Sequence, residues 1–226
     1  MKYSKVICGK FIERPNRFIA VVDIDGKRET VHVKNTGRCR ELLLPGCTVY
    51  LAVSDNTNRK TRCDLIAVDK SGTLINMDSQ APNEVAEEWL RDGGLFSKSA
   101  VIRREVTYGK SRFDFYIEDC GRKIYLEVKG CTLEKDGVAM FPDAPTERGV
   151  KHINELVECK KEGYEAYLLI VVQMSGCRKF VPNDETHKAF GDALRAAEAA
   201  GVNVIAVDCE IHPDSVRICN SIPVEL

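Results

Sequence analysis

Two acidic side chains and a lysine lie close together in the sequence, within a stretch that has the composition of a strand hairpin. Asp114 falls in the run Ser-Arg-Phe-Asp-Phe-Tyr-Ile, and Glu127 and Lys129 fall in Lys-Ile-Tyr-Leu-Glu-Val-Lys-Gly. Both runs are apolar, and residues 118–121 between them have turn composition, so we predict a β-hairpin. Because strand side chains alternate between faces, Glu127 and Lys129 share one face, on which we expect Asp114 to converge.

Such a group suits metal-assisted chemistry on phosphate esters. Two carboxylates at short range make a hard oxygen site for Mg²⁺ or Mn²⁺, which takes further ligands from water and substrate phosphate. A lysine two residues beyond the second acid can hold that phosphate or the attacking water. Asp114 and Glu127 are therefore candidate metal ligands, and together with Lys129 they are candidate catalytic residues. The alternative is an ordinary hairpin whose polar face meets water.

The length and composition indicate a soluble globular protein. At 226 residues the chain is long enough for one large domain or two small ones, and 44% of its residues are hydrophobic. No apolar run approaches the roughly 18–20 residues that a membrane span needs. The N-terminal residues lack the apolar core of a signal peptide, so we predict a cytoplasmic protein with no membrane partner.

Ten cysteines are a high number for a chain of this length, and they have two explanations. They form no Cys-x-x-Cys pair and no Cys/His cluster at zinc-finger spacing. Several lie inside apolar, strand-like runs. In a reducing compartment such cysteines are mostly small buried hydrophobes, so we predict this role and no metal cluster.

The net charge of −1 conceals an asymmetry along the chain. Residues 1–80 hold 14 Lys and Arg against 9 Asp and Glu, whereas residues 81–226 hold 19 against 25. A basic part beside an acidic part favours a polyanion partner for the first and a metal site in the second. Chance variation of a few charges is the alternative.

The N-terminal part, residues 1–80, reads as a small β-domain. Alternating segments and turn signals predict six short strands, at 5–14, 18–24, 29–33, 47–53, 63–69 and 73–77. This number of strands suggests a small barrel, and the oligonucleotide-binding (OB) fold is the common barrel of this size that grips nucleic acid. A protein-binding module of similar size fits the same pattern.

A loop in this domain carries candidate nucleic-acid contacts. Asn35, Thr36 and Gly37 predict a turn whose backbone can approach a ligand closely, and Arg38 and Arg40 follow at once. Backbone amides and guanidinium groups together can bind phosphate. The alternative is a plain loop followed by a short helical turn.

The second part, residues 81–226, reads as a layered α/β domain with a mixed sheet. Asn83 is predicted to cap a helix over 84–91, and Thr146 a helix over 147–163. A third helix is predicted over 189–200. Further strands are predicted at 101–108, 167–173 and 202–208, of which 167–173 is apolar throughout, as in a sheet buried on both faces.

Several charged residues of this domain have two interpretations. Arg148, Lys151 and His152 lie near the start of a predicted helix, where exposed amides favour an anion, but such charges usually form a solvated helix face. Arg112 adjoins the acidic pair and is a further candidate contact. Glu105 is either a third acid or a solvated strand residue. His152 is less expected as a general base than in a contact or structural role.

The order of these elements resembles the PD-(D/E)xK nuclease superfamily, with Phe113 where the superfamily label has proline. More narrowly, the chain resembles the sugar fermentation stimulation protein (SfsA) family over nearly its whole length. The motifs that carry this resemblance are Asn-Thr-Gly-Arg at 35–38, Ser-Arg-Phe-Asp at 111–114, Glu-Val-Lys at 127–129, Phe-Pro-Asp-Ala at 141–144, Thr-Glu-Arg-Gly at 146–149 and Lys-His at 151–152.

The resemblance implies an OB-like domain joined to a restriction-endonuclease-like α/β domain, and DNA binding with little sequence preference. Two functions follow from it: a Mg²⁺-dependent deoxyribonuclease that uses Asp114, Glu127 and Lys129, or a non-catalytic DNA-binding regulator of sugar (maltose) utilisation genes. The intact acidic pair and lysine favour the enzyme. A homodimer is one option, since enzymes of this fold often dimerise. The sequence leaves the choice of strand, of DNA or RNA, and of pathway open.

Overall fold

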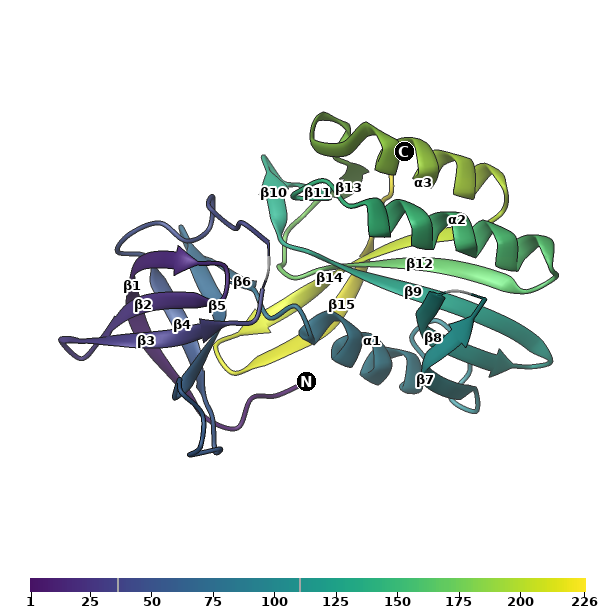
Figure 1. Cartoon of the computed structure of the whole chain (residues 1–226). Coiled ribbons are helices and arrows are strands. Elements are labelled where there is room, and N and C mark those ends of the chain that lie inside the picture. The colour runs from purple at the N-terminus through teal and green to yellow at the C-terminus, as the bar shows by residue number, and fades with distance from the viewer. Residues whose placement is uncertain (36, 110) are drawn as a thin grey trace.

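The computed structural model describes residues 1–35, 37–109 and 111–226 and shows two domains joined side by side (Figure 1). Thr36, part of the predicted turn, lies outside these residues. The first domain consists of six strands: β1 (Val6–Asn16), β2 (Ile19–Ile24), β3 (Lys27–Val33), β4 (Thr48–Val53), β5 (Cys63–Lys70) and β6 (Thr73–Asn76).

The first domain is a closed barrel. Its strands follow the order β3-β2-β1-β4-β5-β6, and β3 also pairs in parallel with β5, which closes the ring of strands β1 to β5. Strand alternation turns Val22, Val31, Val49 and Leu51 into the interior, where they are fully buried. The predicted OB-type barrel is thus confirmed.

The second domain is built on a mixed six-stranded sheet with the order β15-β14-β12-β9-β8-β7. Its strands are β7 (Val101–Tyr108), β8 (Ser111–Asp119), β9 (Arg122–Cys131), β12 (Glu165–Val172), β14 (Asn203–His212) and β15 (Ser215–Ile222). Strand β12 runs parallel to both β9 and β14, and the remaining pairs are antiparallel. A small second sheet contains β10 (Leu133–Lys135), β11 (Val138–Phe141) and β13 (Lys179–Pro182).

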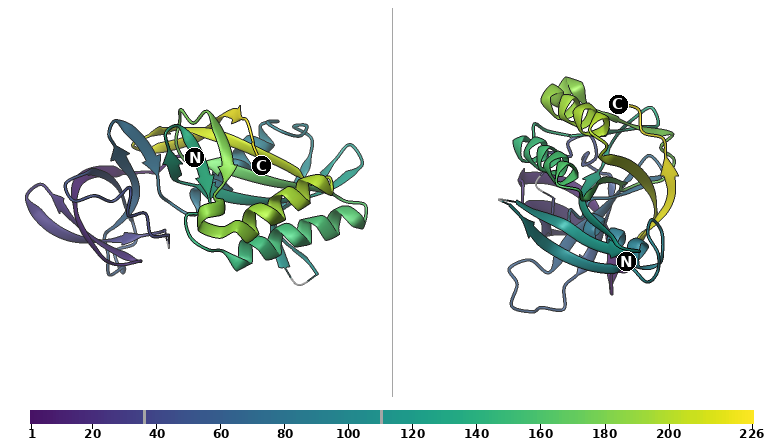
Figure 2. Two further views of the ribbon diagram at one scale, coloured as in Figure 1. Left: turned by 90° about the horizontal axis from the view of Figure 1, so that it is seen from above. Right: turned by 90° about the vertical axis from the view of Figure 1, so that its right-hand side faces the viewer.

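Helices cover both faces of the large sheet. Helix α1 (Ala81–Arg91) packs on one face, while α2 (Glu147–Lys161) and α3 (Asp184–Ala199) lie side by side on the other (Figures 1 and 2). Leu168 and Leu169 of β12 join opposite hydrophobic clusters, which explains why this strand is apolar throughout. The predicted α/β layered domain is confirmed.

Local boundaries differ from the sequence-based expectations in two helices. Helix α1 starts at Ala81, after Gln80, instead of at Glu84 with an Asn83 cap, because proline is well accommodated in a first helical turn. Helix α3 starts at Asp184, several residues before the predicted Ala189, and the side chain of Asn183 caps it. The α2 cap at Thr146 is confirmed, since its hydroxyl accepts from the Gly149 amide.

Most cysteines behave as the composition predicts. All ten are free thiols, and those at 39, 63, 131, 159, 177 and 209 are buried. Burial raises the pKa of the Cys131 and Cys209 thiols to about 12, which keeps them neutral. In the part of the chain that the structure describes, no helix is long and apolar enough to span a membrane.

A buried polar contact joins the two domains. The side-chain amide of Gln173, at the end of β12, donates to Asn76 Oδ1 (2.9 Å) and to the Asp78 carbonyl (3.0 Å), while the Asn76 backbone amide donates to the Gln173 carbonyl (2.9 Å). Gly130 permits this approach, because a Cβ there would lie 2.6 Å from Gln173 Oε1. The barrel is therefore held directly against the end of the sheet where the neighbouring strands β9 and β12 finish, close to Lys129 in the sequence.

We predict that Gln173→Leu destabilises the protein by about 1–3 kcal/mol, because two buried hydrogen bonds are lost. The matched control is Gln80→Leu, at an exposed position whose side chain makes no capping hydrogen bond. It should change the free energy of unfolding by less than about 0.5 kcal/mol. Urea denaturation measures both, and equal effects of the two substitutions would contradict the role of Gln173.

Candidate active site

Asp114 lies where strands β8 and β9 separate. Their ladder runs from Asp119 opposite Arg122 to Phe115 opposite Leu126 and does not extend to Asp114. The Asp114 carboxylate instead accepts the Val128 amide through Oδ2 (2.7 Å), and Oδ1 accepts from Asn83 Nδ2 on α1 (2.8 Å). The side chain thus replaces a strand carbonyl and is fixed from two elements.

Glu127 is buried beside Lys129 and His152. Its Oε1 accepts from Lys129 Nζ and from His152 Nδ1, both at 2.5 Å. Arg148 Nε donates to His152 Nε2 at 3.4 Å, which assigns the ring proton to Nδ1. Glu127 Oε2 is buried and has no hydrogen-bond partner among the residues that the structure describes. One oxygen of this carboxylate is therefore saturated and the other is left for a ligand.

The two carboxylates differ in their proton affinity. Burial, and then repulsion from Glu127, raise the pKa of Asp114 from 3.8 to about 6. Burial also raises the pKa of Glu127, but the hydrogen bonds from His152 and Lys129 and the charge of Lys129 outweigh it and hold this pKa below its ordinary value. Glu127 is thus ionised at neutral pH, whereas burial and the negative charge of Glu127 oppose the ionisation of Asp114.

This arrangement fits a divalent cation shared with a substrate. Among residues 1–35, 37–109 and 111–226, no three His, Cys, Asp or Glu side chains are grouped as a complete metal site. Mg²⁺, however, is commonly held by one or two carboxylates, with waters and substrate phosphates completing its shell. Glu127 Oε2 and the Asp114 carboxylate offer such a donor set, and a cation would satisfy the Oε2 atom that now has no partner.

The predicted basic residues fall on two surfaces. Arg112, Arg148 and Lys151 line a hollow of about 600 Å³ beside His152. Arg112 Nε also lies 2.7 Å from Glu105 Oε2, and both side chains are exposed. Glu105 is therefore a solvated strand residue, and the acidic pair consists of Asp114 and Glu127. Lys151 Nζ lies 3.7 Å from Glu155 Oε1, one turn further along α2.

The other predicted contacts lie on the barrel. Arg38 and Arg40 are exposed there. The Asn35 side chain is used within the fold, since Nδ2 donates to the Met77 carbonyl (3.0 Å) and Oδ1 accepts the Gly37 amide (2.7 Å). Asn35 therefore shapes the loop that carries the two arginines.

Two supporting residues, Asn83 and Arg14, have roles that the sequence does not predict. Asn83 holds Asp114 and is not the cap of α1, and Arg14 organises the Asn35 loop through its backbone carbonyls. His152 holds Glu127, a contact of the structural kind that the sequence favours for it. The i, i+4 spacing of Arg148 and His152 on one helix face was the available signal for their contact. Nothing local in the sequence indicates the contacts of Asn83 or Arg14.

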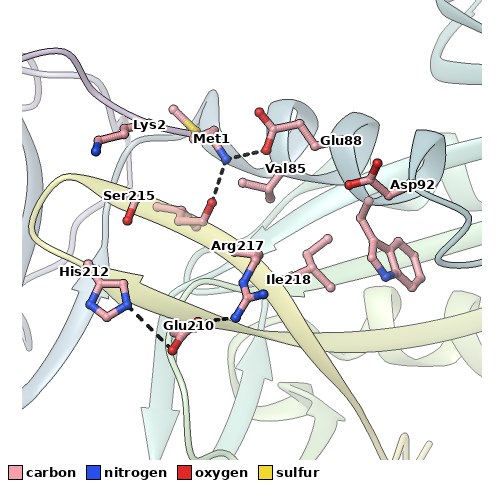
Figure 3. Close-up of a pocket in the computed structure, with 12 residues that line it drawn as sticks. Met1, Lys2, Val85, Glu88, Asp92, Glu210, His212, Ser215, Arg217 and Ile218 are labelled. Carbon is pink, nitrogen blue, oxygen red and sulfur yellow. Dashed lines mark hydrogen bonds and ion pairs between the residues drawn. The ribbon is translucent and has the colours of Figure 1, made fainter.

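A separate cavity of about 640 Å³ lies between α1 and the β14–β15 hairpin (Figure 3). The Met1 amino group bonds there to Glu88 and to the Val216 carbonyl, and Arg217 pairs with Glu210 at 2.6 Å. These contacts fasten the N-terminal segment across the second domain. Neither Asp114 nor Glu127 lines this cavity.

The barrel, the mixed sheet and the acidic pair define a class of two-domain proteins in which an OB barrel precedes an α/β sheet domain. A family model described as the SfsA N-terminal OB domain matches residues 12–77, and one described as the sugar fermentation stimulation protein RE domain matches residues 80–215. The chain belongs to the sugar fermentation stimulation protein (SfsA) family. This confirms the family indicated by the sequence motifs.

Relatives share the whole length of the chain. Sugar fermentation stimulation protein homologs of Clostridium beijerinckii and Desulfitobacterium hafniense are 54% and 55% identical over 226 residues, covering 100% of this chain and 100% and 99% of theirs. A solved structure of Pyrococcus furiosus SfsA in complex with Ca²⁺ superposes with a TM-score of 0.90 at 28% identity, covering 100% of this chain and 98% of that one.

We predict that Asp114→Asn stabilises the metal-free protein at high pH. A carboxyl group whose folded pKa is raised binds its proton more tightly in the folded state, so it removes stability as pH rises from about 4 to about 6. Above that window the ionised Asp114 lowers the free energy of unfolding by about 3 kcal/mol. The Asp114→Asn variant avoids this cost, and the side-chain amide of Asn83 can flip so that the hydrogen bond between positions 83 and 114 is kept.

Urea denaturation in a chelator at several pH values measures this difference. The free energies of unfolding of the native protein and Asp114→Asn should agree at about pH 4. At about pH 8 the value for Asp114→Asn should be higher by about 3 kcal/mol. A difference that does not change with pH would contradict the assigned proton affinity of Asp114.

A second prediction concerns His152. His152→Leu should lower the free energy of unfolding by about 2–3 kcal/mol, because a buried carboxylate loses a donor. His152→Asn places an amide near the position of Nδ1 and should recover at least half of that loss. Thermal or urea unfolding at neutral pH compares them, and identical losses would show that ring packing, and not the bond to Glu127, is what His152 supplies.

Proposed function

We propose that this protein is a divalent-cation-dependent DNA phosphodiesterase whose centre is formed by Asp114, Glu127 and Lys129. The observation that carries the proposal is the buried Glu127 Oε2, which finds no partner within residues 1–35, 37–109 and 111–226 and lies beside a second carboxylate and a lysine. A protein without such a catalytic centre has no evident need to hold together two acids that repel one another. The Ca²⁺ present in the Pyrococcus furiosus relative supports a cation at a site of this family.

Asp114 and Glu127 would hold the cation, which we expect to be Mg²⁺ or Mn²⁺. When bound, such an ion supplies charge neutralisation at phosphate and lowers the pKa of a coordinated water. Asn83 and the Val128 amide fix the Asp114 carboxylate, and His152 fixes Glu127 through Oε1, which leaves Oε2 for the cation. These supports hold the ligands without rearrangement on binding.

Lys129 supplies the mobile positive charge of the site. Its ammonium group now bonds to Glu127 Oε1 and its side chain is 17% exposed, so it lies at the boundary between the buried acids and solvent. From there it can donate to a phosphate oxygen as charge builds up on it. Arg112, Arg148 and Lys151 line the adjoining hollow and would hold neighbouring phosphates.

A non-catalytic, sequence-nonspecific DNA-binding regulator of sugar-utilisation genes is the second candidate. The family description, sugar fermentation stimulation protein, favours it, as does the presence of two rather than three grouped acids in the described residues. Both candidates require DNA as the partner and a cytoplasmic location. Both also predict affinity that falls steeply with salt. A homodimer would allow the enzyme to cut both strands.

Cleavage of end-labelled single-stranded and duplex DNA with Mg²⁺ or Mn²⁺ separates these candidates. Asp114→Ala and Lys129→Ala should each lower the rate by at least about 100-fold, the scale seen for lost charge-stabilising groups. Lys123→Ala, which removes an exposed lysine from the same strand, is the matched control and should cut like the native protein. DNA affinity should persist in all three variants.

Two results would contradict the enzyme. Native protein that binds DNA but never cuts it with either metal would favour the regulator. Equal cleavage by the native and Lys129→Ala preparations would assign the activity to a contaminant or to another site.

A further inference from the structure

One end of the barrel carries an arginine-lined hollow of about 430 Å³. It lies between the β1–β2 turn and the loop that follows β3, and Arg14, Arg17, Arg38 and Arg40 all line it. No acidic side chain is among its lining residues in the described chain. Such a concentration of guanidinium groups complements a polyanion.

An exposed aromatic ring stands at the same turn. Phe18 is 45% exposed, and among the described residues it shares this property with only two other large hydrophobic side chains, Leu44 and Val101. The Arg17 guanidinium lies over its ring at 4.8 Å from the centroid. The exposed part of the ring offers a stacking surface for a planar group.

The turn is held in place before any ligand arrives. Asn16 Oδ1 accepts the Phe18 amide (2.9 Å) at the tip of the hairpin. The Arg14 guanidinium donates to the Arg17 carbonyl (2.7 Å) and to the carbonyls of Gly37 and Arg38 (both 2.9 Å). One half-buried arginine therefore couples the aromatic turn to the loop that carries Arg38, so the two sides of the hollow keep a fixed separation.

We propose that this surface, formed by Arg17, Phe18, Arg38 and Arg40 and here called the Phe18 platform, binds single-stranded DNA. One base stacks on Phe18, and the phosphates on either side contact the arginines. The proposal rests on the proposed function for its DNA partner and adds the strand form that is bound. A single strand fits because its bases expose their faces, whereas duplex bases are already stacked on one another.

A second pocket adjoins the arginine hollow. Gly37 lines both the arginine hollow and a second pocket of about 300 Å³ between the domains, and that pocket is also lined by Gly130, the neighbour of Lys129. A Cβ at Gly37 would lie 2.6 Å from Asp143 Oδ2, so the carboxylate of Asp143 enters this second pocket. A carboxylate there disfavours phosphate, so the phosphates of a bound strand are expected at the arginines.

Fluorescence anisotropy in a chelator tests the platform without requiring cleavage. The probes are labelled oligo-dT about 20 nucleotides long, which exceeds the roughly 4–16 nucleotides that one OB fold covers, and the same strand annealed to oligo-dA. Phe18→Ala should weaken binding of the single strand roughly 5- to 150-fold, since one stacked base contributes about 1–3 kcal/mol. Phe18→Tyr keeps the ring and should bind within about threefold of the native protein.

Val101→Ala, at another exposed apolar side chain, is the matched control and should leave the affinity unchanged. Arg38→Gln with Arg40→Gln should reduce the salt dependence of single-strand binding by about 0.7 in slope for each phosphate that is no longer neutralised. Native-like single-strand affinity in Phe18→Ala, or tighter binding of the duplex with an equal loss in that variant, would overturn the proposal.

The two proposals fail in different ways. Binding of the single strand that depends on Phe18, without any cleavage when metal is added, would overturn the phosphodiesterase and leave the platform standing. Cleavage that depends on Lys129, together with a single-strand affinity that is unchanged in Phe18→Ala, would do the reverse.

Discussion

The candidate site depends on one local event, the separation of strands β8 and β9 at Asp114. Where the backbone ladder stops, the Asp114 carboxylate takes over the Val128 amide, so a functional group is held with the rigidity of a sheet hydrogen bond. Beside this separation, the pairs of β7 with β8 also omit Asp114 and Glu105, and Glu105 has a positive φ of 57°. Without the separation, Asp114 would be one more residue in a regular ladder and its carboxylate would have no fixed place beside Glu127.

The same event has a cost in stability. Two carboxylates are kept close together in a largely buried place, and the pKa of Asp114 rises to about 6 as a result. The surroundings offset this cost unevenly: Glu127 receives His152 and Lys129, whereas Asp114 receives only neutral donors from Asn83 and Val128. An unbalanced negative charge of this kind is what a divalent cation would neutralise, as is common at sites where function opposes stability.

Much of the fold could be predicted from the sequence because it follows from local patterns. Alternation along 111–129 places Glu127 and Lys129 on one face, and the continuous apolar run of β12 indicates a strand buried on both faces. Boundaries that depend on competing local signals were less secure, as the start of α1 shows: Asn83 resembles a cap, but Pro82 fits a helix that has already begun. Strand β15 gives no clear signal in the sequence, because it is an edge strand in which exposed polar residues are interspersed with the buried ones.

The support of the site could not be predicted in the same way. The bond from Asn83 to Asp114 joins α1 to β8, and the bond from His152 to Glu127 joins α2 to β9. Arg14 likewise acts on a loop more than twenty residues away by donating to backbone carbonyls, which leave no trace in residue type. These contacts arise from tertiary packing, and no periodicity or spacing encodes them.

The most direct test of the account is a calorimetric titration of the metal-free protein with Mn²⁺ or Mg²⁺ near about pH 8, where Asp114 is ionised. We predict saturable binding in the native protein and an affinity at least about tenfold lower in Glu127→Gln. Substituting even a residue that only supports a metal ligand lowers metal affinity by about this factor. A more exposed acid of the same hairpin provides the control, Glu118→Gln, which should bind like the native protein. Absence of saturable binding in the native protein, or equal binding by Glu127→Gln, would contradict the claim that Asp114 and Glu127 form a cation site.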